Sequence, residues 1–167
     1  MSKPTVYLDT NIFSVLHYRG GDPGVLQKQR ATHEWWEQER HFFRLLASKA
    51  VEGELAKGDY PGKERALAEV RRLPYLTFLP AVNEVTAKLF AAHIVPLMAP
   101  GDALQLAFAT VHRVDYLLSW NRAHLVGPET QVRLARFRAA SGWRTPLVVS
   151  PESIPKAALG QSIRRRD

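Results

Sequence analysis

Short apolar runs alternate along the chain with longer segments whose apolar residues recur every three or four positions. The runs predict strands, because apolar stretches of this length fit a strand covered on both faces. The periodic segments predict amphipathic helices that turn one face toward the sheet. The expected strands cover residues 5–9, 42–48, 75–79, 115–120 and 146–150. The expected helices cover residues 11–18, 25–41, 49–58, 63–73, 83–98, 101–114 and 128–143.

The order of these elements predicts an α/β fold. Strands that alternate with helices favour a central parallel sheet, here of about five strands, in a three-layer α/β/α arrangement. A chain of 167 residues fits one domain. We expect that domain to cover residues 1–150. Residues 151–167 show no clear period, and we expect them to form a poorly ordered tail.

Composition narrows the class of protein. The chain has no cysteine, which excludes disulfides and thiolate metal sites and is compatible with a reducing compartment. The first residues lack the apolar segment of a signal peptide, and the longest mostly apolar run, residues 89–99, is too short to span a bilayer. We therefore expect a cytoplasmic protein with no membrane partner. The net charge of +7 and the pI near 10.0 favour phosphate-bearing partners.

A carboxylate, Asp9, stands at the end of the first apolar run, in the stretch TVYLDTN of residues 5–11. Ligands of parallel α/β sheets bind outside the carboxyl ends of the strands, so this position suits a functional side chain. Asp, Thr and Asn are also good helix caps, and Asn11 or a neighbour would serve to start the next helix. The stretch alone leaves both interpretations of Asp9 open.

The second carboxylate of interest is Glu54, on the helix expected over residues 49–58. At about 100° per residue, Glu54 falls between Ala50 and Val51 on the apolar face, whereas Glu52 projects roughly 160° away from it. We therefore expect Glu54, and not Glu52, to point inward. A frayed helix end that leaves Glu54 in solvent is the alternative.

The third carboxylate, Asp102, opens a helix with a core stripe of apolar residues. The helix dipole stabilises a carboxylate there by about 0.3–1 kcal/mol, so Asp102 alone has an ordinary structural explanation. Together, three like charges brought close would raise one another's pKa unless a cation lies among them. Oxygen ligands without histidine or thiolate suit Mg²⁺ or Mn²⁺.

Four motifs follow one another within residues 5–124: YLDTN, then Ser48, Val51 and Glu54 spaced S-x-x-V-x-x-E, then GDALQLAFA and LLSWN. In this order they resemble the motifs of PIN-domain ribonucleases, and size and motif order resemble the VapC-type toxins of bacterial type II toxin–antitoxin pairs. The resemblance implies a PIN-like parallel sheet flanked by helices. It also implies a Mg²⁺- or Mn²⁺-dependent endoribonuclease whose metal ligands are Asp9, Glu54 and Asp102.

The resemblance assigns further residues to the site. Asn11 matches a small polar residue that orients ligands or phosphate. Asn121 stands where the family often has Asp, and an amide oxygen carries no charge, so we expect one well-bound metal. Asp115 begins the same strand and would lie at the opposite edge of the sheet. Ser119 and Asn121 would position water. Because an acidic pocket repels RNA, the surrounding basic residues are the candidates to hold it: Arg122, His124, Arg133, Arg136 and Arg138. A solvated helix face for the arginines and a structural role for His124 are the alternatives.

The resemblance also implies partners: an RNA substrate, an antitoxin whose arm enters the acidic groove, and a second copy of the chain in a homodimer. Adjacent Trp35 and Trp36 face different directions, so we expect one in the core; whether the other covers an antitoxin or dimer groove is left open. We expect Trp120 to pack rather than stack on a base. The basic residues 163–166 would bind RNA or fray with the tail.

Two other functions fit parts of the sequence. A PIN-fold module that binds RNA or assembles complexes, with little or no catalysis, is consistent with Asn121 in place of an acid. Phosphatases of the haloacid dehalogenase type also place an aspartate after the first strand. They carry a second, proton-donating aspartate two residues later, where this chain has Asn11.

Overall fold

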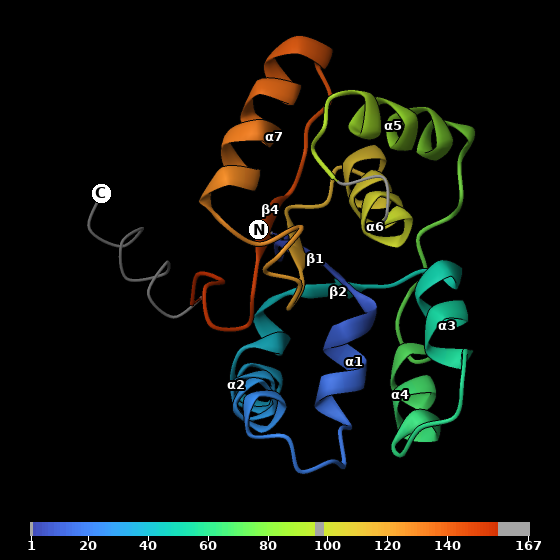
Figure 1. Ribbon diagram of the computed structural model, residues 1–167, viewed down its shortest axis with the longest axis vertical. Coiled ribbons are helices and arrows are strands. Elements are labelled where there is room, and N and C mark those ends of the chain that lie inside the picture. Colours follow the sequence, from blue (N-terminus) through green and yellow to red (C-terminus); the bar gives the residue numbers. More distant parts are fainter. Residues whose placement is uncertain (1, 96–98, 157–167) are drawn as a thin grey trace.

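Four parallel strands form the sheet in the computed structural model, which describes residues 2–95 and 99–156 (Figure 1). They are β1 (Thr5–Leu8), β2 (Arg44–Leu46), β3 (Tyr116–Leu118) and β4 (Leu147–Val149). The order is β2-β1-β3-β4, and every pairing is parallel. All four carboxyl ends therefore lie at one edge of the sheet and all four amino ends at the other. The predicted α/β class is confirmed.

Helices cover both sides of this sheet, as the alternation of elements predicted. In Figure 1, α1 to α4 gather on one side and α5 to α7 on the other. Their bounds are α1 (Thr10–Leu16), α2 (Pro23–Gln38), α3 (Lys49–Ala56), α4 (Lys63–Val70), α5 (Pro80–Ala91), α6 (Pro100–Val111) and α7 (Pro128–Ser141), with a short 3-10 helix η1 (Arg40–Phe42). Proline lies in the first turn of four of them, α2, α5, α6 and α7, where its missing N–H costs nothing.

The strand expected over residues 75–79 is not formed. Only Tyr75 pairs with the sheet, through an isolated parallel bridge to Ala47. After this bridge the chain turns away from the sheet, and Phe78 and Leu79 are 53% and 40% exposed. Pro80 starts α5 and restricts the backbone of the residue before it. Too few residues therefore remain after Tyr75 for further pairing with the sheet. The predicted fifth strand was therefore wrong, and the sheet of the described residues has four.

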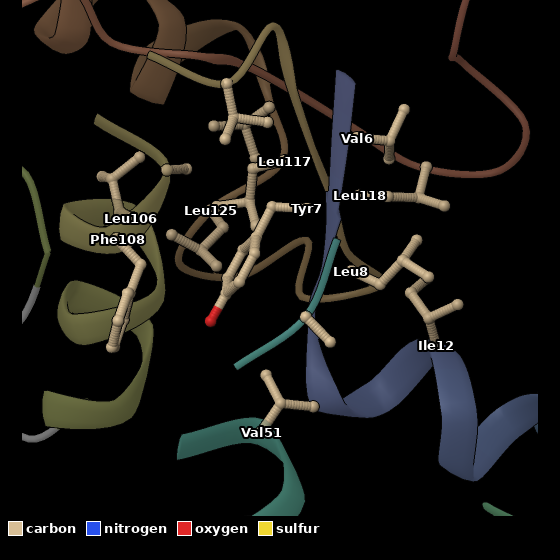
Figure 2. Close-up of a cluster of buried hydrophobic side chains, with 14 of the residues drawn as sticks. Val6, Tyr7, Leu8, Ile12, Val51, Leu106, Phe108, Leu117, Leu118 and Leu125 are labelled. Carbon is tan, nitrogen blue, oxygen red and sulfur yellow. The ribbon is translucent and has the colours of Figure 1, made fainter. Parts of the chain in front are cut away.

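The core explains why the first strand shows no alternation of polar and apolar residues. Val6, Tyr7 and Leu8 are all fully buried. Figure 2 shows Tyr7 on the side of α6, near Leu106 and Phe108, whereas Leu8 lies on the other side of β1. Both faces of β1 are thus covered by apolar side chains, as expected for a central parallel strand.

The three tryptophans singled out from the sequence lie in the core. Trp35 and Trp36 are 3% and 8% exposed and contact the rings of Phe43 and Phe13, respectively. The expectation that one of the pair lies in the core is confirmed, and the second is buried as well, which leaves neither exposed to a partner groove. Trp120 is also buried, as predicted, and donates from Nε1 to Thr32 Oγ1 at 2.9 Å.

The chain after β4 is described as far as residue 156. Residues 151–154 form a turn in which Ser153 N and Ile154 N donate to Ser150 O, and Ile154 is buried. Residues 157–167, including the basic stretch 163–166, lie outside the described residues. Within the described ranges, every helix is too short or too polar to cross a bilayer.

Replacing Ser48 by Ala should destabilise the protein by about 1–3 kcal/mol. Ser48 caps α3 by accepting from Val51 N at 3.3 Å, and its hydroxyl also bonds to the buried Tyr7 hydroxyl at 2.6 Å. Urea unfolding followed by tryptophan fluorescence measures the change. Ser14→Ala is the matched control, because Ser14 Oγ donates to Asn11 O on its own helix. Equal stabilities for the two variants would contradict this role of Ser48.

Candidate active site at the carboxyl edge of the sheet

Asp9 is both a helix cap and a buried carboxylate. Its backbone N donates to Leu118 O at 3.0 Å, which extends the β1–β3 pairing by one residue. Its Oδ1 accepts from Thr10 N at 2.8 Å as the cap of α1, and its Oδ2 accepts from Ser119 Oγ at 2.7 Å and Asn11 Nδ2 at 3.3 Å. Only 4% of the residue is exposed. The cap is therefore Asp9 and not Asn11, and it lies at the sheet edge predicted for a site.

Burial raises the pKa of Asp9 from 3.8 to about 6, although hydrogen bonds from Ser119 and Thr10 act in the opposite direction. The charges of Asp102 and Glu54 raise this pKa further. Charges on two other segments, Glu54 on α3 and Asp102 on α6, thus act on the Asp9 carboxylate. This is the electrostatic coupling expected if the three acids converge.

Glu54 points toward Asp9, and Glu52 points away. Glu54 Oε2 accepts from Thr10 Oγ1 at 2.7 Å, directly beside Asp9. Glu52 accepts from Tyr75 OH at 2.7 Å and forms ion pairs with Lys49 and Arg71 on the outer side of α3. The predicted helix face is confirmed, and the frayed helix end is excluded because α3 continues to Ala56.

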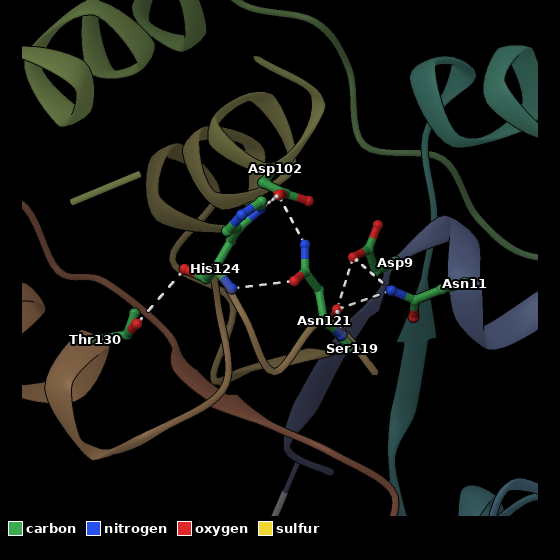
Figure 3. A network of polar contacts seen from close by, with 7 residues as sticks. All are labelled: Asp9, Asn11, Asp102, Ser119, Asn121, His124 and Thr130. Carbon is green, nitrogen blue, oxygen red and sulfur yellow. Dashed lines mark hydrogen bonds and ion pairs between the residues drawn. The ribbon is translucent and has the colours of Figure 1, made fainter. Parts of the chain in front are cut away.

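Asp102 lies in the first turn of α6, as predicted. Its Oδ2 accepts from Asn121 Nδ2 at 2.7 Å and lies 3.1 Å from His124 Nδ1 (Figure 3). The preceding Gly101 lets Glu54 approach the same turn, since a Cβ there would stand 2.9 Å from Glu54 Oε1. The helix dipole of α6 stabilises both carboxylates at this end.

Asn121 does not present its oxygen to the acidic cluster. Its Oδ1 accepts from His124 N at 3.1 Å, so the NH₂ group is turned to Asp102. In this arrangement the amide oxygen of Asn121 is therefore not offered to the cluster, and the part of Asn121 in catalysis stays a prediction. Asn121 is instead a neutral donor that satisfies one oxygen of Asp102.

Ser119 and Asn11 tie the ends of β1 and β3 together. Ser119 Oγ accepts from Asn11 Nδ2 at 3.1 Å and Asn121 N at 3.0 Å while it donates to Asp9. Asn11 Oδ1 accepts from Trp120 N at 2.9 Å. These contacts fix Asp9 in place (Figure 3). Contact with substrate or water by either residue stays a prediction.

The residues fit a hard divalent cation in the type of donor they offer. Three carboxylates with mutual repulsion are the setting in which Mg²⁺ or Mn²⁺ is stabilising. Within residues 2–95 and 99–156, no three acidic or histidine side chains are close enough to hold a metal as they stand. Several carboxylate oxygens are instead turned to neutral donors, so side-chain rotation would have to bring Asp9, Glu54 and Asp102 together.

The basic residues expected to hold RNA are distributed around this edge and along α7. Arg122 pairs with Glu152 at 2.6 Å and lies over the ring of Trp120. Arg133 pairs with Glu129 and donates to His93 O at 3.0 Å. Exposed pairs of this kind contribute little stability. Arg136 and Arg138 are exposed on α7.

Asp115 lies at the opposite edge, as predicted. Its Oδ2 accepts from Thr5 N and Thr5 Oγ1, at 2.9 and 3.0 Å, and its Oδ1 accepts from Arg144 at 2.7 Å. It takes no part in the acidic cluster.

Two residues of the site escaped the sequence analysis. Thr10 holds Glu54, and Gln105 Nε2 lies 3.5 Å from Glu54 Oε1 while its own Oε1 accepts from the buried Tyr7 hydroxyl. Gln105 follows Asp102 by three positions and so shares its helix face. A buried amide on an otherwise apolar stripe was the available signal.

The sequence matches no protein-family model and, at a significant level, no curated protein. Among solved structures, the chain is similar to FitAcB from Neisseria gonorrhoeae, with 13% identity and a TM-score of 0.54 over 90% of this chain and 100% of that one. VapBC2 from Rickettsia felis, bound to a DNA fragment from their promoter, matches at 13% identity and a TM-score of 0.45 over 87% and 98%. The first likeness confirms the PIN-like fold; the second is too distant to support an argument.

The raised pKa of Asp9 should make stability depend on pH in metal-free buffer with EDTA. Between pH 4 and 6 the unfolded chain loses the Asp9 proton while the folded protein keeps it, so the free energy of unfolding should fall as pH rises. The loss should approach about 3 kcal/mol and become constant only above about pH 7, where the folded protein has also lost the proton. Urea titrations of wild type and Asp9→Asn measure it: relative to wild type, the variant should gain stability from pH 4 to pH 8. A difference independent of pH would contradict the raised pKa.

Proposed function

We propose that this protein is a metal-dependent endoribonuclease that cleaves RNA phosphodiester bonds, and that it is the toxin of a toxin–antitoxin pair. The observation that carries the proposal is the buried Asp9 carboxylate, whose pKa is raised by burial and by Asp102 and Glu54. A fold gains nothing from gathering three repelling acids at a sheet edge unless a ligand uses them. The order of motifs and the PIN-like fold support the same assignment.

In this proposal Asp9, Glu54 and Asp102 hold Mg²⁺ or Mn²⁺. When bound, the cation would lower the pKa of a water molecule and polarise the scissile phosphate. The chain itself supplies the placement: Ser119 and Thr10 N fix Asp9, Thr10 Oγ1 fixes Glu54, and Asn121 fixes Asp102. These contacts hold the three carboxylates at one edge of the sheet, from which side-chain rotation would bring them together around the cation.

His124 and Arg122 are the nearest candidates to contact the substrate backbone. The side chain of His124 lies beside Asp102 and is 40% exposed, and the side chain of Arg122 is 59% exposed. The acidic cluster repels RNA, so the surrounding cations must hold it. An unstacked single strand suits such a site, because its backbone and bases are accessible.

A toxin of this kind also requires a partner that blocks it. We propose an antitoxin whose basic arm enters the acidic groove, and a homodimer as the assembled form. The cytoplasm is the compartment in which a cysteine-free, RNA-cleaving protein of this charge would act.

A second candidate function is an RNA-binding or assembly module with little catalysis. The orientation of Asn121 favours it, because the fourth position of the cluster contributes a donor instead of a ligand oxygen. The two functions differ in two measurable properties: whether the carboxylates bind a metal ion, and whether the protein cleaves RNA.

Neutralising the cluster should abolish cleavage without unfolding the protein. Asp9→Asn, Glu54→Gln and Asp102→Asn should each lower Mg²⁺-dependent cleavage of single-stranded RNA by roughly 10²-fold or more. Glu52→Gln is the matched control on the same helix and should retain nearly full activity, since Glu52 contacts Tyr75 and Arg71 on the outer face. If Glu52→Gln lost cleavage while Glu54→Gln kept it, the carboxylate that α3 contributes to the site would be Glu52 and not Glu54.

Metal binding should also be visible without any substrate. Mn²⁺ should raise the melting temperature of wild type, because a ligand at 100 times its Kd stabilises the folded state by about 2.7 kcal/mol. Asp9→Asn and Asp102→Asn should lose this shift, and Glu52→Gln should keep it. A wild-type protein that Mn²⁺ does not stabilise would favour the non-catalytic module.

A further inference from the structure

A set of cations occupies the edge of the sheet opposite the acidic cluster. Because all four strands are parallel, their amino ends meet there, and each end brings one basic residue. Arg44 begins β2, Lys3 precedes β1 by two residues, and Arg113 and Arg144 precede β3 and β4 by three. Arg44 lies in the β ladder itself, paired with Thr5, and the other three stand in the segments that lead into their strands.

These cations line a hollow of about 550 Å³. That volume falls in the range of small-molecule sites, about 300–1,000 Å³. The lining consists of Ser2, Lys3, Thr5, Phe43, Arg44, Arg113, Asp115 and Arg144.

The charge in this hollow is largely uncompensated. Asp115 is its one carboxylate, and it accepts from Thr5 and from Arg144. Within the described part of the chain, Arg144 is also the only one of the four cations in an ion pair, and Lys3, Arg44 and Arg113 form none there. Three cations thus remain available to an anion.

The backbone at Arg113 adds a second feature. Arg113 has φ of 54° and follows the end of α6, with Arg113 N donating to Thr110 O and Val114 N to Ala109 O. This is the left-handed residue that closes a helix, a position at which glycine fits without strain. The chain keeps an arginine there, and its side chain lines the hollow.

We propose that this hollow binds the phosphate groups of an anionic ligand. Guanidinium groups hold phosphate oxygens through paired N–H donors, and Lys3 adds a point charge. The hollow lies roughly 13 Å from Asp9, the length of a four-residue strand at about 3.3 Å per residue, so it does not hold the bond to be cleaved. The site is therefore distinct from the acidic cluster and does not depend on the proposed nuclease activity.

Isothermal titration of the full chain with sodium tripolyphosphate, in EDTA and at fixed ionic strength, tests the proposal. Wild type should bind at one saturable site. Arg44→Gln combined with Arg113→Gly should weaken binding at least tenfold, and the glycine removes the charge while suiting the left-handed backbone. Arg30→Gln combined with Arg72→Gln is the control, because it removes equal charge from exposed positions elsewhere.

Two results would overturn the proposal: no saturable binding by wild type, or an equal loss of affinity in the control. Asp102→Asn should bind tripolyphosphate as wild type does, which separates this site from the proposed active site.

The source of the phosphate is identified with a labelled, uncleavable 2′-O-methyl oligoribonucleotide in an anisotropy assay. If the Arg44/Arg113 variant binds it more weakly and tripolyphosphate displaces it, the ligand is the backbone of a nucleic acid strand. If its affinity is unchanged in that variant while tripolyphosphate binding is lost, the ligand is a free polyphosphate or nucleotide.

Discussion

The buried carboxylate of Asp9 is the constraint on which the carboxyl edge of the sheet depends. A carboxylate that is 4% exposed is stable only if hydrogen bonds or an opposite charge replace the water it has lost. Ser119, Asn11 and the backbone of Thr10 supply hydrogen bonds, and they come from the strand and helix ends that meet there. Glu54 and Asp102 work against this balance by adding negative charge. The local structure thus tolerates the cluster without removing its repulsion.

The parallel sheet separates the two kinds of charge. Strands that run in one direction place every carboxyl end at one edge and every amino end at the other. The acids of the proposed active site lie at the first edge, and the cations of the proposed phosphate site lie at the second. Asp115 illustrates the separation: it belongs to the same strand region as Ser119, but it binds Thr5 and Arg144 at the amino edge. Two sites of opposite charge therefore follow from one topology.

The sequence predicted what depends on periodicity and missed what depends on contacts between distant segments. Strand β1, the helices around it and the inward face of Glu54 follow from spacing along the chain. The segment at residues 75–79 has a strand-like composition, but its neighbours Pro74 and Pro80 leave room for one bridge only. The amide of Asn121 is oriented by the backbone of His124 in a loop, and Trp36 is buried by Phe13 from another helix. Neither arrangement leaves a local signal in the sequence.

The central claim is that Asp9, Glu54 and Asp102 act on one another electrostatically at one point of the fold. The most direct measurement is the pKa of the Asp9 carboxyl carbon, followed by NMR as a function of pH in metal-free protein. The account predicts a value near 6 in wild type. It also predicts a lower value when Glu54→Gln or Asp102→Asn removes a neighbouring charge. A pKa at the ordinary value of aspartate, or one that neither substitution changes, would contradict it.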